Sequence, residues 1–173
     1  MQNKAVINYQ YFRCSFGELK LGSYDEKLCL CDWRYRTRRN QIDQRIEKGL
    51  NATFLEKNDA VIEYACQQLL EYFAYRRKKF TIPLLLVGTA FQKKVWSRLQ
   101  EVAFGETLTY LQLAESTANR ESVRAVASAN GANAISIFVP CHRIVGSTGS
   151  LVGYAGGTGT KAKLLSIEND LFI

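Results

Sequence analysis

Histidine, methionine and proline are scarce in this chain. Its 173 residues include one histidine, one methionine and two prolines. A structural zinc site usually takes four cysteine and histidine ligands, so one histidine leaves little to complete such a site around Cys29 and Cys31. The five cysteines do not follow the spacing of a disulfide scaffold. We therefore expect no bound metal, no other cofactor and no disulfide framework.

The chain also lacks a long hydrophobic run. No apolar segment approaches the roughly 20 residues that cross a bilayer, and the first residues do not resemble a signal peptide. Free thiols suit a reducing compartment. These observations predict a cytoplasmic protein with no membrane partner.

Acidic residues are outnumbered by basic ones. The formal net charge is +7 and the sequence pI is about 9.2, which favours polyanionic partners. The visible basic clusters, Arg34/Arg36/Arg38/Arg39 and 76–79, lie in the first half of the chain. The alternative interpretation is a solvated face and the basic end of a helix, where cations complement the helix dipole.

The only histidine directly follows a cysteine, in the pair Cys141-His142. A thiol acts as a nucleophile in its thiolate form, and a nearby imidazole is a usual proton acceptor. Neighbouring side chains in an extended segment point to opposite sides, so we expect a bridging water between sulfur and imidazole. An inert buried cysteine beside a surface histidine is the alternative that the pair alone leaves open.

The hydrophobic pattern divides the chain into two domains, 1–83 and 84–173. Short β-type segments between residues 5 and 35 predict a small antiparallel sheet, and a polar stretch follows up to about residue 57. Apolar residues with helical spacing from Val61 to Phe73 then predict a helix capped by Asn58 or Asp59, and the first unit ends near Arg77. The second domain is mainly α-helical, with helices predicted near 89–101, 107–118, 120–130 and 159–169.

Two short segments of the second domain match a helix-turn-helix pattern, 110–115 and 123–130. The second helix leaves one arginine among small residues on one side: Arg124, Ala127, Ser128 and Gly131. An ordinary exposed face would carry several Lys and Glu, whereas a helix that enters a groove of DNA needs small residues. A small-residue face packed against another helix is the alternative, in which Arg124 would need a buried partner.

Six segments, in order and at matching spacing, resemble one family. They are 88–96 (GTAFQKKVW), 104–110 (FGETLTY), 123–126 (VRAV), 130–133 (NGAN), 140–143 (PCHR) and 153–157 (GYAGG). Together they are similar to the O6-alkylguanine-DNA alkyltransferases, also called methylated-DNA-protein-cysteine methyltransferases. The resemblance covers nearly all of the second half, and the first half resembles the family's α/β N-terminal domain in outline.

The resemblance implies direct-reversal DNA repair by a monomer. A winged-helix-like helix-turn-helix would bind double-stranded DNA through the minor groove and rotate O6-alkylguanine out of the duplex, which costs a few kcal/mol. The alkyl group would then move irreversibly to Cys141, one group per protein molecule. Whether O4-alkylthymine is also a substrate stays open.

The resemblance also implies roles for individual residues. Cys141 would attack the alkyl carbon, His142 would accept the thiol proton through a water, and Glu168 would orient the imidazole. Arg124 would fill the space that the base leaves, on a helix face that also presents Ala127, Ser128 and Gly131. The remaining predicted site residues brace the cysteine turn (Asn133), contact phosphate and guanine N3 (Tyr110), form the guanine pocket (Ser147, Tyr154, Gly156, Gly157) or lie near that loop (Lys161).

The sequence departs from the family pattern at the link between the two helices. A glycine and a proline are usual there, whereas this chain has Ala118-Asn119-Arg120-Glu121, in which Asn119 is a candidate N-cap. Ala134 stands where proline is common, and Val102-Ala103-Phe104-Gly105 replaces isoleucine-proline-tyrosine-glycine. Two other functions remain open: a damage-binding protein that does not repair, and a cysteine hydrolase that uses Cys141 and His142.

Overall fold

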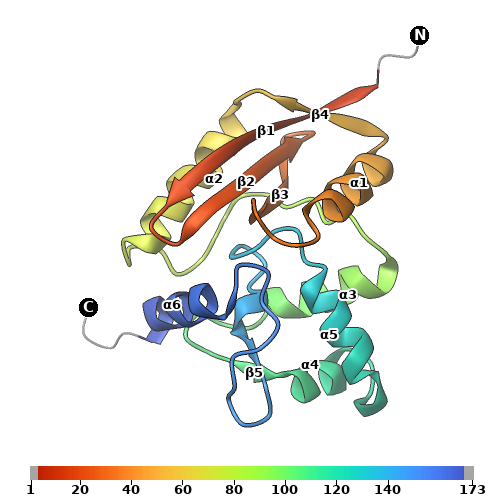
Figure 1. Cartoon of the computed structure of the whole chain (residues 1–173), viewed down its shortest axis with the longest axis vertical. Helices are drawn as coiled ribbons and strands as arrows, with labels where there is room; N and C mark the ends of the chain where they lie inside the picture. Colours follow the sequence, from red (N-terminus) through yellow and green to blue (C-terminus); the bar gives the residue numbers. More distant parts are fainter. Residues whose placement is uncertain (1–3, 170–173) are drawn as a thin grey trace. The chain divides into compact units, whose positions relative to one another are not determined.

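The computed structural model describes residues 4–169 of the chain (Figure 1). The chain forms two compact units, Met1–Gly88 and Thr89–Ile173. The division falls after Gly88 rather than after Pro83, because Leu84 bridges to Leu28 and the Leu85 amide donates to the Leu28 carbonyl at 2.9 Å. The outer ends of both predicted domains, 1–3 and 170–173, lie outside the described residues.

Unit 1 is a mixed four-stranded sheet with two helices. Its strands follow the order β3-β2-β1-β4; β1–β2 and β2–β3 are antiparallel, whereas β1–β4 is parallel. The elements are β1 (Ala5–Cys14), β2 (Gly17–Tyr24), β3 (Lys27–Trp33), α1 (Arg39–Leu50), β4 (Ala52–Glu56) and α2 (Ala60–Phe73). The antiparallel sheet predicted within residues 5–35 and the predicted helix are therefore present, and the parallel strand β4 adds to this sheet at an edge that the sequence analysis did not foresee.

The sequence analysis missed α1 and β4 within the stretch that it described as polar. In α1 only Ile42 and Ile46 are buried, and most of the other positions carry polar or charged side chains. In β4 only Ala52 is buried, because this short strand lies at the edge of the sheet. The few apolar residues of these two elements gave a pattern too sparse to be assigned among their polar neighbours.

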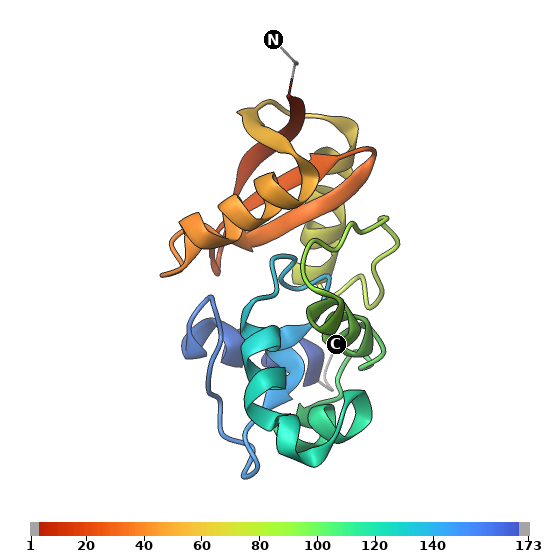
Figure 2. The ribbon, with the colours of Figure 1, turned by 90° about the vertical axis from the view of Figure 1, so that its right-hand side faces the viewer.

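Hydrophobic side chains of unit 1 are buried between the sheet and α2. From β2 and β3 this core takes Leu19, Leu21 and Cys31, and from α2 it takes Ile62, Ala65, Leu69 and Tyr72, all at most 1% exposed. Figure 2 shows α1 (orange) on the side of the sheet away from α2 (olive). One face of this sheet therefore packs against α2 and the other face lies on the side of α1.

Unit 2 consists mainly of helices, as predicted. Its elements are α3 (Ala90–Gln100), β5 (Leu108–Thr109), α4 (Tyr110–Thr117), η1 (Arg120–Ser122), α5 (Val123–Gly131), η2 (Cys141–Arg143), β6 (Ile144–Val145) and α6 (Thr158–Asn169). The four predicted helices correspond to α3, α4, η1 with α5, and α6. Within residues 4–169 no helix is both long and apolar enough to cross a membrane.

The link between α4 and α5 differs in detail from the expectation. Asn119 stands at the N-cap position of η1, but its side chain makes no bond to a backbone amide there. The side-chain oxygen Oδ1 of Asn119 instead accepts a hydrogen bond from the hydroxyl of Ser122 at 2.7 Å. Asn119 and Ser122 thus close the turn through their side chains, in place of the glycine and proline usual in the family.

One carboxylate stabilises the start of α2 and joins it to the sheet. Asp59 accepts the amide of Ile62 at 2.9 Å, the side-chain amide of Asn8 at 2.9 Å and the hydroxyl of Ser23. Partial burial opposes ionisation, but these donors outweigh it and lower the Asp59 pKa. A helix cap and two bonds to neighbouring strands therefore depend on one ionised side chain.

We predict that Asp59→Ala lowers the free energy of unfolding by about 1–2 kcal/mol, the usual effect of losing an N-cap. Asp59→Asn is the matched control, because asparagine caps helices and keeps the size of the side chain. Since the Asp59 pKa is lowered in the folded state, its contribution is present above the unfolded-state pKa and is lost as the pH falls. Urea denaturation at neutral and acidic pH measures both effects; equal stability of Asp59→Ala and the parent would contradict them.

Candidate active site

Cys141 is the first residue of the short helix η2 and is 4% exposed. The segment before it makes a constrained turn. Ile137 has φ 75°, a conformation that is costly for a β-branched side chain, and it is 1% exposed. The amide of Val139 donates to the carbonyl of Ile135 at 2.9 Å, and the amide of Cys141 donates to the carbonyl of Val139 at 2.8 Å. Packing and backbone bonds thus hold a strained turn directly before the cysteine.

Asn133 joins both ends of this turn. Its Nδ2 donates to the carbonyl of Val139 at 2.9 Å and to Cys141 Sγ at 3.1 Å, and its Oδ1 accepts the amide of Ile135 at 2.9 Å. Asn133 is 2% exposed, so these bonds are shielded from water. The sulfur therefore has a fixed hydrogen-bond donor beside it, and the bracing position predicted for Asn133 agrees with this geometry.

His142 is fully buried and faces Glu168 of α6. The distance from His142 Nε2 to Glu168 Oε1 is 2.7 Å. The other ring nitrogen, Nδ1, has no hydrogen-bond partner among residues 4–169. The structure thus brings together the predicted histidine and carboxylate and leaves one imidazole nitrogen available.

Arg143 holds the same carboxylate from a second direction. Its Nε and NH2 atoms donate to the two oxygens of Glu168 at 2.8 and 2.9 Å, and NH1 donates to the carbonyl of Val102 at 2.6 Å. The amide of Gly105 approaches Glu168 Oε2 at 3.4 Å. This fork geometry is the strongest form of a charge-assisted hydrogen bond. Arg143 is thus an anchor for Glu168, as the sequence analysis expected of a structural residue.

The charges of this network determine the tautomer of His142. Burial opposes the ionised form of Glu168, but hydrogen bonds from His142 and Arg143 outweigh it and lower the Glu168 pKa to about 2. Burial lowers the pKa of His142, although Glu168 opposes this shift, so the imidazole is neutral at neutral pH. A carboxylate only accepts hydrogen bonds, so the single ring proton must be on Nε2. Nδ1 then carries a lone pair and can accept a proton.

Tyr110 and Lys161 meet at the carbonyl of Val152. The Tyr110 hydroxyl donates to it at 3.2 Å and Lys161 Nζ at 2.9 Å, while Nζ also donates to the carbonyl of Ile144. Burial lowers the pKa of Lys161, and burial followed by the nearby Cys141 raises the pKa of Tyr110. Lys161 is therefore a clamp between β6 and the loop that follows it, and Tyr110 keeps its proton.

A short parallel pairing positions Tyr110. Leu108 and Thr109 of β5 pair with Ile144 and Val145 of β6, which directly follow η2. Thr109 also caps α4 through a reciprocal pair of bonds with Gln112. Because Tyr110 follows β5 without a break, its position is linked to the segment that carries the cysteine.

The residues predicted to form the guanine pocket lie in the loop between β6 and α6. Tyr154 is half-buried, and its ring centroid lies 6.4 Å from that of His142. Gly156 and Gly157 form the turn before α6, where Gly157 has φ 87°. Ser147 is exposed, and no described contact joins it to Cys141. The structure thus brings Tyr154 close to the predicted catalytic residues, but not Ser147.

The exposed side of α5 agrees with the predicted pattern. Arg124, Ser128 and Gly131 are exposed, Ala127 is half-buried, and Val126, Ala129 and Asn130 are buried. Trp96 of α3 donates its indole N–H to the carbonyl of Ala129 at 2.8 Å and so anchors the end of α5. Arg124 is not a buried arginine that needs a partner, so the alternative of a packed small-residue face does not apply.

Some contributors to the site were missed at the sequence level. Val102 and Gly105 act through backbone atoms, and Ile137 acts through its φ angle, so their side chains give no chemical signal. Gly105 has φ 82°, and an added Cβ would lie 3.1 Å from the carbonyl oxygen of Glu168. The glycine in the segment 104–110 was the one available sign of this close approach.

The comparisons with known proteins agree with this geometry. Residues 90–170 match the sequence profile described as "6-O-methylguanine DNA methyltransferase, DNA binding domain". The methylated-DNA-protein-cysteine methyltransferase of Mycolicibacterium paratuberculosis is 37% identical over 163 residues, which cover 94% of this chain and 93% of the relative. The constitutive enzyme of Bacillus subtilis is 50% identical over 105 residues, 60% of this chain and 64% of the relative.

A solved structure extends the similarity to the fold. Mycobacterium tuberculosis OGT in complex with DNA has a TM-score of 0.80 and 33% identity, covering 94% of this chain and 93% of that chain. Fold and site together define a DNA-binding protein with a buried cysteine flanked by polar side chains. The chain belongs to the family of methylated-DNA-protein-cysteine methyltransferases.

We predict that Arg143→Leu lowers the free energy of unfolding by about 3–5 kcal/mol, because it leaves the buried charge of Glu168 uncompensated. The double variant Arg143→Leu/Glu168→Leu should recover part of this loss. In the parent, the lowered Glu168 pKa means that the carboxylate contributes stability above pH 4.5 and loses it as the pH falls toward 2. Urea denaturation of all four proteins of the cycle measures the coupling; strictly additive losses would argue against a charge-compensating pair.

Proposed function

We propose that this protein repairs alkylated DNA by transferring the alkyl group from O6 of guanine to Sγ of Cys141. The observation that carries this proposal is the arrangement of Cys141, Asn133, His142 and Glu168, in a chain that belongs to the methyltransferase family. The proposal includes action as a monomer, which the family resemblance implies. The proposal includes the cytoplasmic location that the sequence predicts.

The reaction begins with removal of the thiol proton of Cys141. In this account a water molecule relays the proton to Nδ1 of His142, whose Nε2–H stays bonded to Glu168. The resulting imidazolium is stabilised by the ionised carboxylate, which Arg143 holds in place. Asn133 donates to the sulfur and favours its anionic form.

The transfer itself is an in-line displacement. The sulfur–carbon bond forms as the carbon–O6 bond breaks, and the electron pair of that bond moves onto the departing guanine. Tyr110 keeps its proton, so it can donate a hydrogen bond to guanine N3 and stabilise this negative charge. In the free protein that hydroxyl donates to Val152, so the base would take the place of a backbone carbonyl.

Binding of DNA is assigned to α4, η1 and α5. The exposed small residues of α5 let its backbone approach the minor groove, and Arg124 would occupy the space that the rotated base leaves. The loop from Gly146 to Gly157, after the short β6, serves as the wing-like element and would enclose the base with Ser147, Tyr154 and Gly156. Lys161 would hold this loop in shape, because it bonds both β6 at Ile144 and the middle of the loop at Val152.

The product determines the stoichiometry. A thioether on Cys141 has no good leaving group, so each protein molecule would act once. DNA supplies the electrophile and the protein supplies the nucleophile and the base, so the proposed reaction needs no metal or organic cofactor. Both O6-alkylguanine and O4-alkylthymine carry an alkyl group on an exocyclic oxygen, and the same displacement applies to each.

We predict that incubation with duplex DNA containing O6-methylguanine adds the mass of one methylene to the Cys141 peptide, because a methyl group replaces the thiol hydrogen. The reaction should stop at one equivalent of lesion. Peptide mass spectrometry measures the modification and titration of the lesion measures the stoichiometry. Cys66→Ala is the matched control, because this half-buried thiol of α2 has a pKa raised to about 11 by burial.

The outcomes separate the competing functions. Repeated turnover of the lesion would refute a consumed cysteine and would favour hydrolysis or another catalytic cycle. Tight binding of the lesion without a mass change on Cys141 would indicate a damage-binding protein. Loss of the mass change in Cys141→Ala but not in Cys66→Ala is the result that the proposal requires.

We predict that the single-turnover rate falls at acidic pH with a pKa below 6.5, because protonation of His142 removes the proton acceptor. Burial lowers this pKa, so the loss of rate should begin at a lower pH than it would for a solvent-exposed imidazole. Rapid-quench measurements with excess DNA give the profile. The control is the binding of the lesion duplex by Cys141→Ala over the same pH range. If binding does not change but the rate falls with a midpoint at or above pH 6.5, the result would be inconsistent with a buried neutral imidazole.

A further inference from the structure

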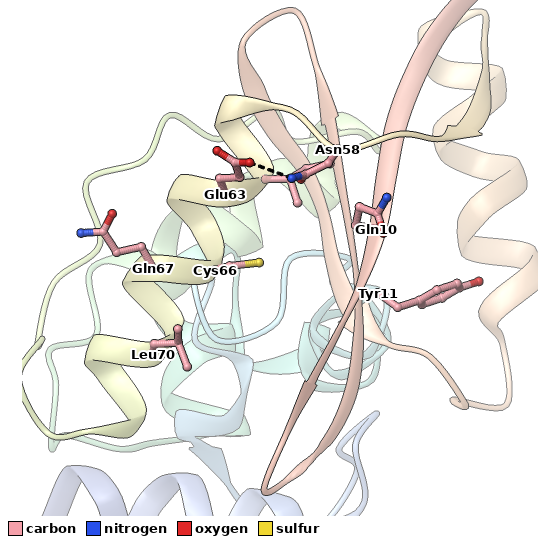
Figure 3. Close-up of a pocket in the computed structure, with 8 residues that line it drawn as sticks. Gln10, Tyr11, Asn58, Glu63, Cys66, Gln67 and Leu70 are labelled. Atoms are coloured by element: carbon pink, nitrogen blue, oxygen red, sulfur yellow. Dashed lines mark hydrogen bonds between the residues drawn. The ribbon is translucent and has the colours of Figure 1, made fainter.

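The sheet of unit 1 presents tyrosine and arginine side chains on the face away from α2. Neighbouring residues of β1 point to opposite faces. Gln10, Tyr11 and Cys66 all line the groove along α2, but Figure 3 shows that the ring of Tyr11 is directed away from α2, to the other side of the strand. Tyr11 therefore belongs to a surface that the α2 core does not use.

Three side chains form a stack on this face, which we name the Tyr–Arg stack: Tyr11, Arg34 and Tyr35. The guanidinium carbon of Arg34 lies 3.8 Å from the ring centroid of Tyr11 and 5.2 Å from that of Tyr35. Tyr9 meets Tyr11 edge to face, with centroids 5.6 Å apart. The Arg34 side chain is also bonded to Glu18 at 3.1 Å, which fixes the plane of the guanidinium. The stack is therefore ordered by neighbours on the sheet.

The outer member of the stack is open to solvent. Tyr35 is 79% exposed, more than any other large hydrophobic side chain of the described residues. Such exposure leaves the faces of its ring available for stacking. If the Tyr35 ring served only to cover Arg34, we would expect the ring to be buried against that side chain, because aromatic rings are stabilised by burial. The ring is instead exposed.

The cations around the stack divide into paired and unpaired groups. Arg36 and Arg39 are paired with Asp32, and Lys20 is paired with Asp43, so these charges maintain the fold. Arg13, on the same face of β1 as Tyr11, and Arg38, just before α1, are exposed. Neither forms an ion pair with a described carboxylate. Arg13 and Arg38 are thus two exposed cations of this unit that the described ion pairs leave unused.

We propose that the Tyr–Arg stack binds single-stranded DNA, with an unpaired base on Tyr35 and phosphates at Arg13 and Arg38. Exposed aromatic rings flanked by cations are how single strands are held without sequence preference. In a duplex both faces of each base are covered by neighbouring bases, so a flat ring on a sheet cannot reach them. The partner is therefore a strand with unpaired bases. This activity is separate from alkyl transfer and does not require Cys141.

The test measures binding of lesion-free oligothymidine by fluorescence anisotropy, with the full chain in an Arg124→Ala background that weakens the contribution of α5. Tyr35→Ala should raise the dissociation constant about 5- to 150-fold, the range that corresponds to one stacked base. Tyr35→Trp should retain or improve binding, because it keeps an aromatic face. A strand of equal length made of abasic nucleotides should bind more weakly to the parent and be unaffected by Tyr35→Ala.

Two controls make the result specific. Tyr75→Ala removes another exposed tyrosine of unit 1, next to the basic segment 76–79, and should leave oligothymidine binding unchanged. Methyl transfer to Cys141 in duplex DNA should be unchanged in Tyr35→Ala, which also shows that the variant is folded. Unchanged oligothymidine binding by Tyr35→Ala, or an equal loss for the abasic strand or for Tyr75→Ala, would overturn the proposal.

Discussion

The ionised carboxylate of Glu168 is the group on which the rest of the site depends. It accepts hydrogen bonds from His142 and Arg143, and the amide of Gly105 approaches it. The donors come from η2 and from the loop before β5, and Glu168 itself belongs to α6, so one side chain connects three parts of unit 2. Removing a carboxylate from water costs several kcal/mol, and this cost is offset only when the donors have good geometry. The position of η2, and hence of Cys141, is thereby coupled to the charge of Glu168.

The rigid and the adaptable parts of the site are distinct. Cys141 and Asn133 belong to a buried, strained turn whose hydrogen bonds fix the sulfur before any DNA binds. The loop after β6 is mostly exposed and is held mainly by Lys161. A nucleophile gains from a fixed position, whereas a pocket for a rotated base must admit it first. The division of the unit into these two parts suits a reaction in which recognition precedes a single displacement.

Short sequence patterns were enough to predict Cys141, His142 and the exposed face of α5. The features that depend on contacts between distant parts of the chain could not be predicted in this way. The Cys141-His142 pair and the small-residue face of α5 are visible in a few neighbouring residues. The role of Glu168 came from family resemblance, because 26 positions separate it from the histidine that it orients. The positive φ of Ile137 and the fork from Arg143 arise only when the chain closes around the site. In unit 1 the polar α1 escaped prediction, since only Ile42 and Ile46 of that helix enter the core.

The central claim is that Glu168 fixes His142 as a neutral imidazole with its proton on Nε2. Because the chain has one histidine, nitrogen NMR of protein labelled in histidine reports this side chain without assignment. The account predicts at neutral pH a protonated Nε2 and an unprotonated Nδ1, and this state should persist to a pH below 6.5. A proton on Nδ1, or an imidazolium at neutral pH, would contradict it.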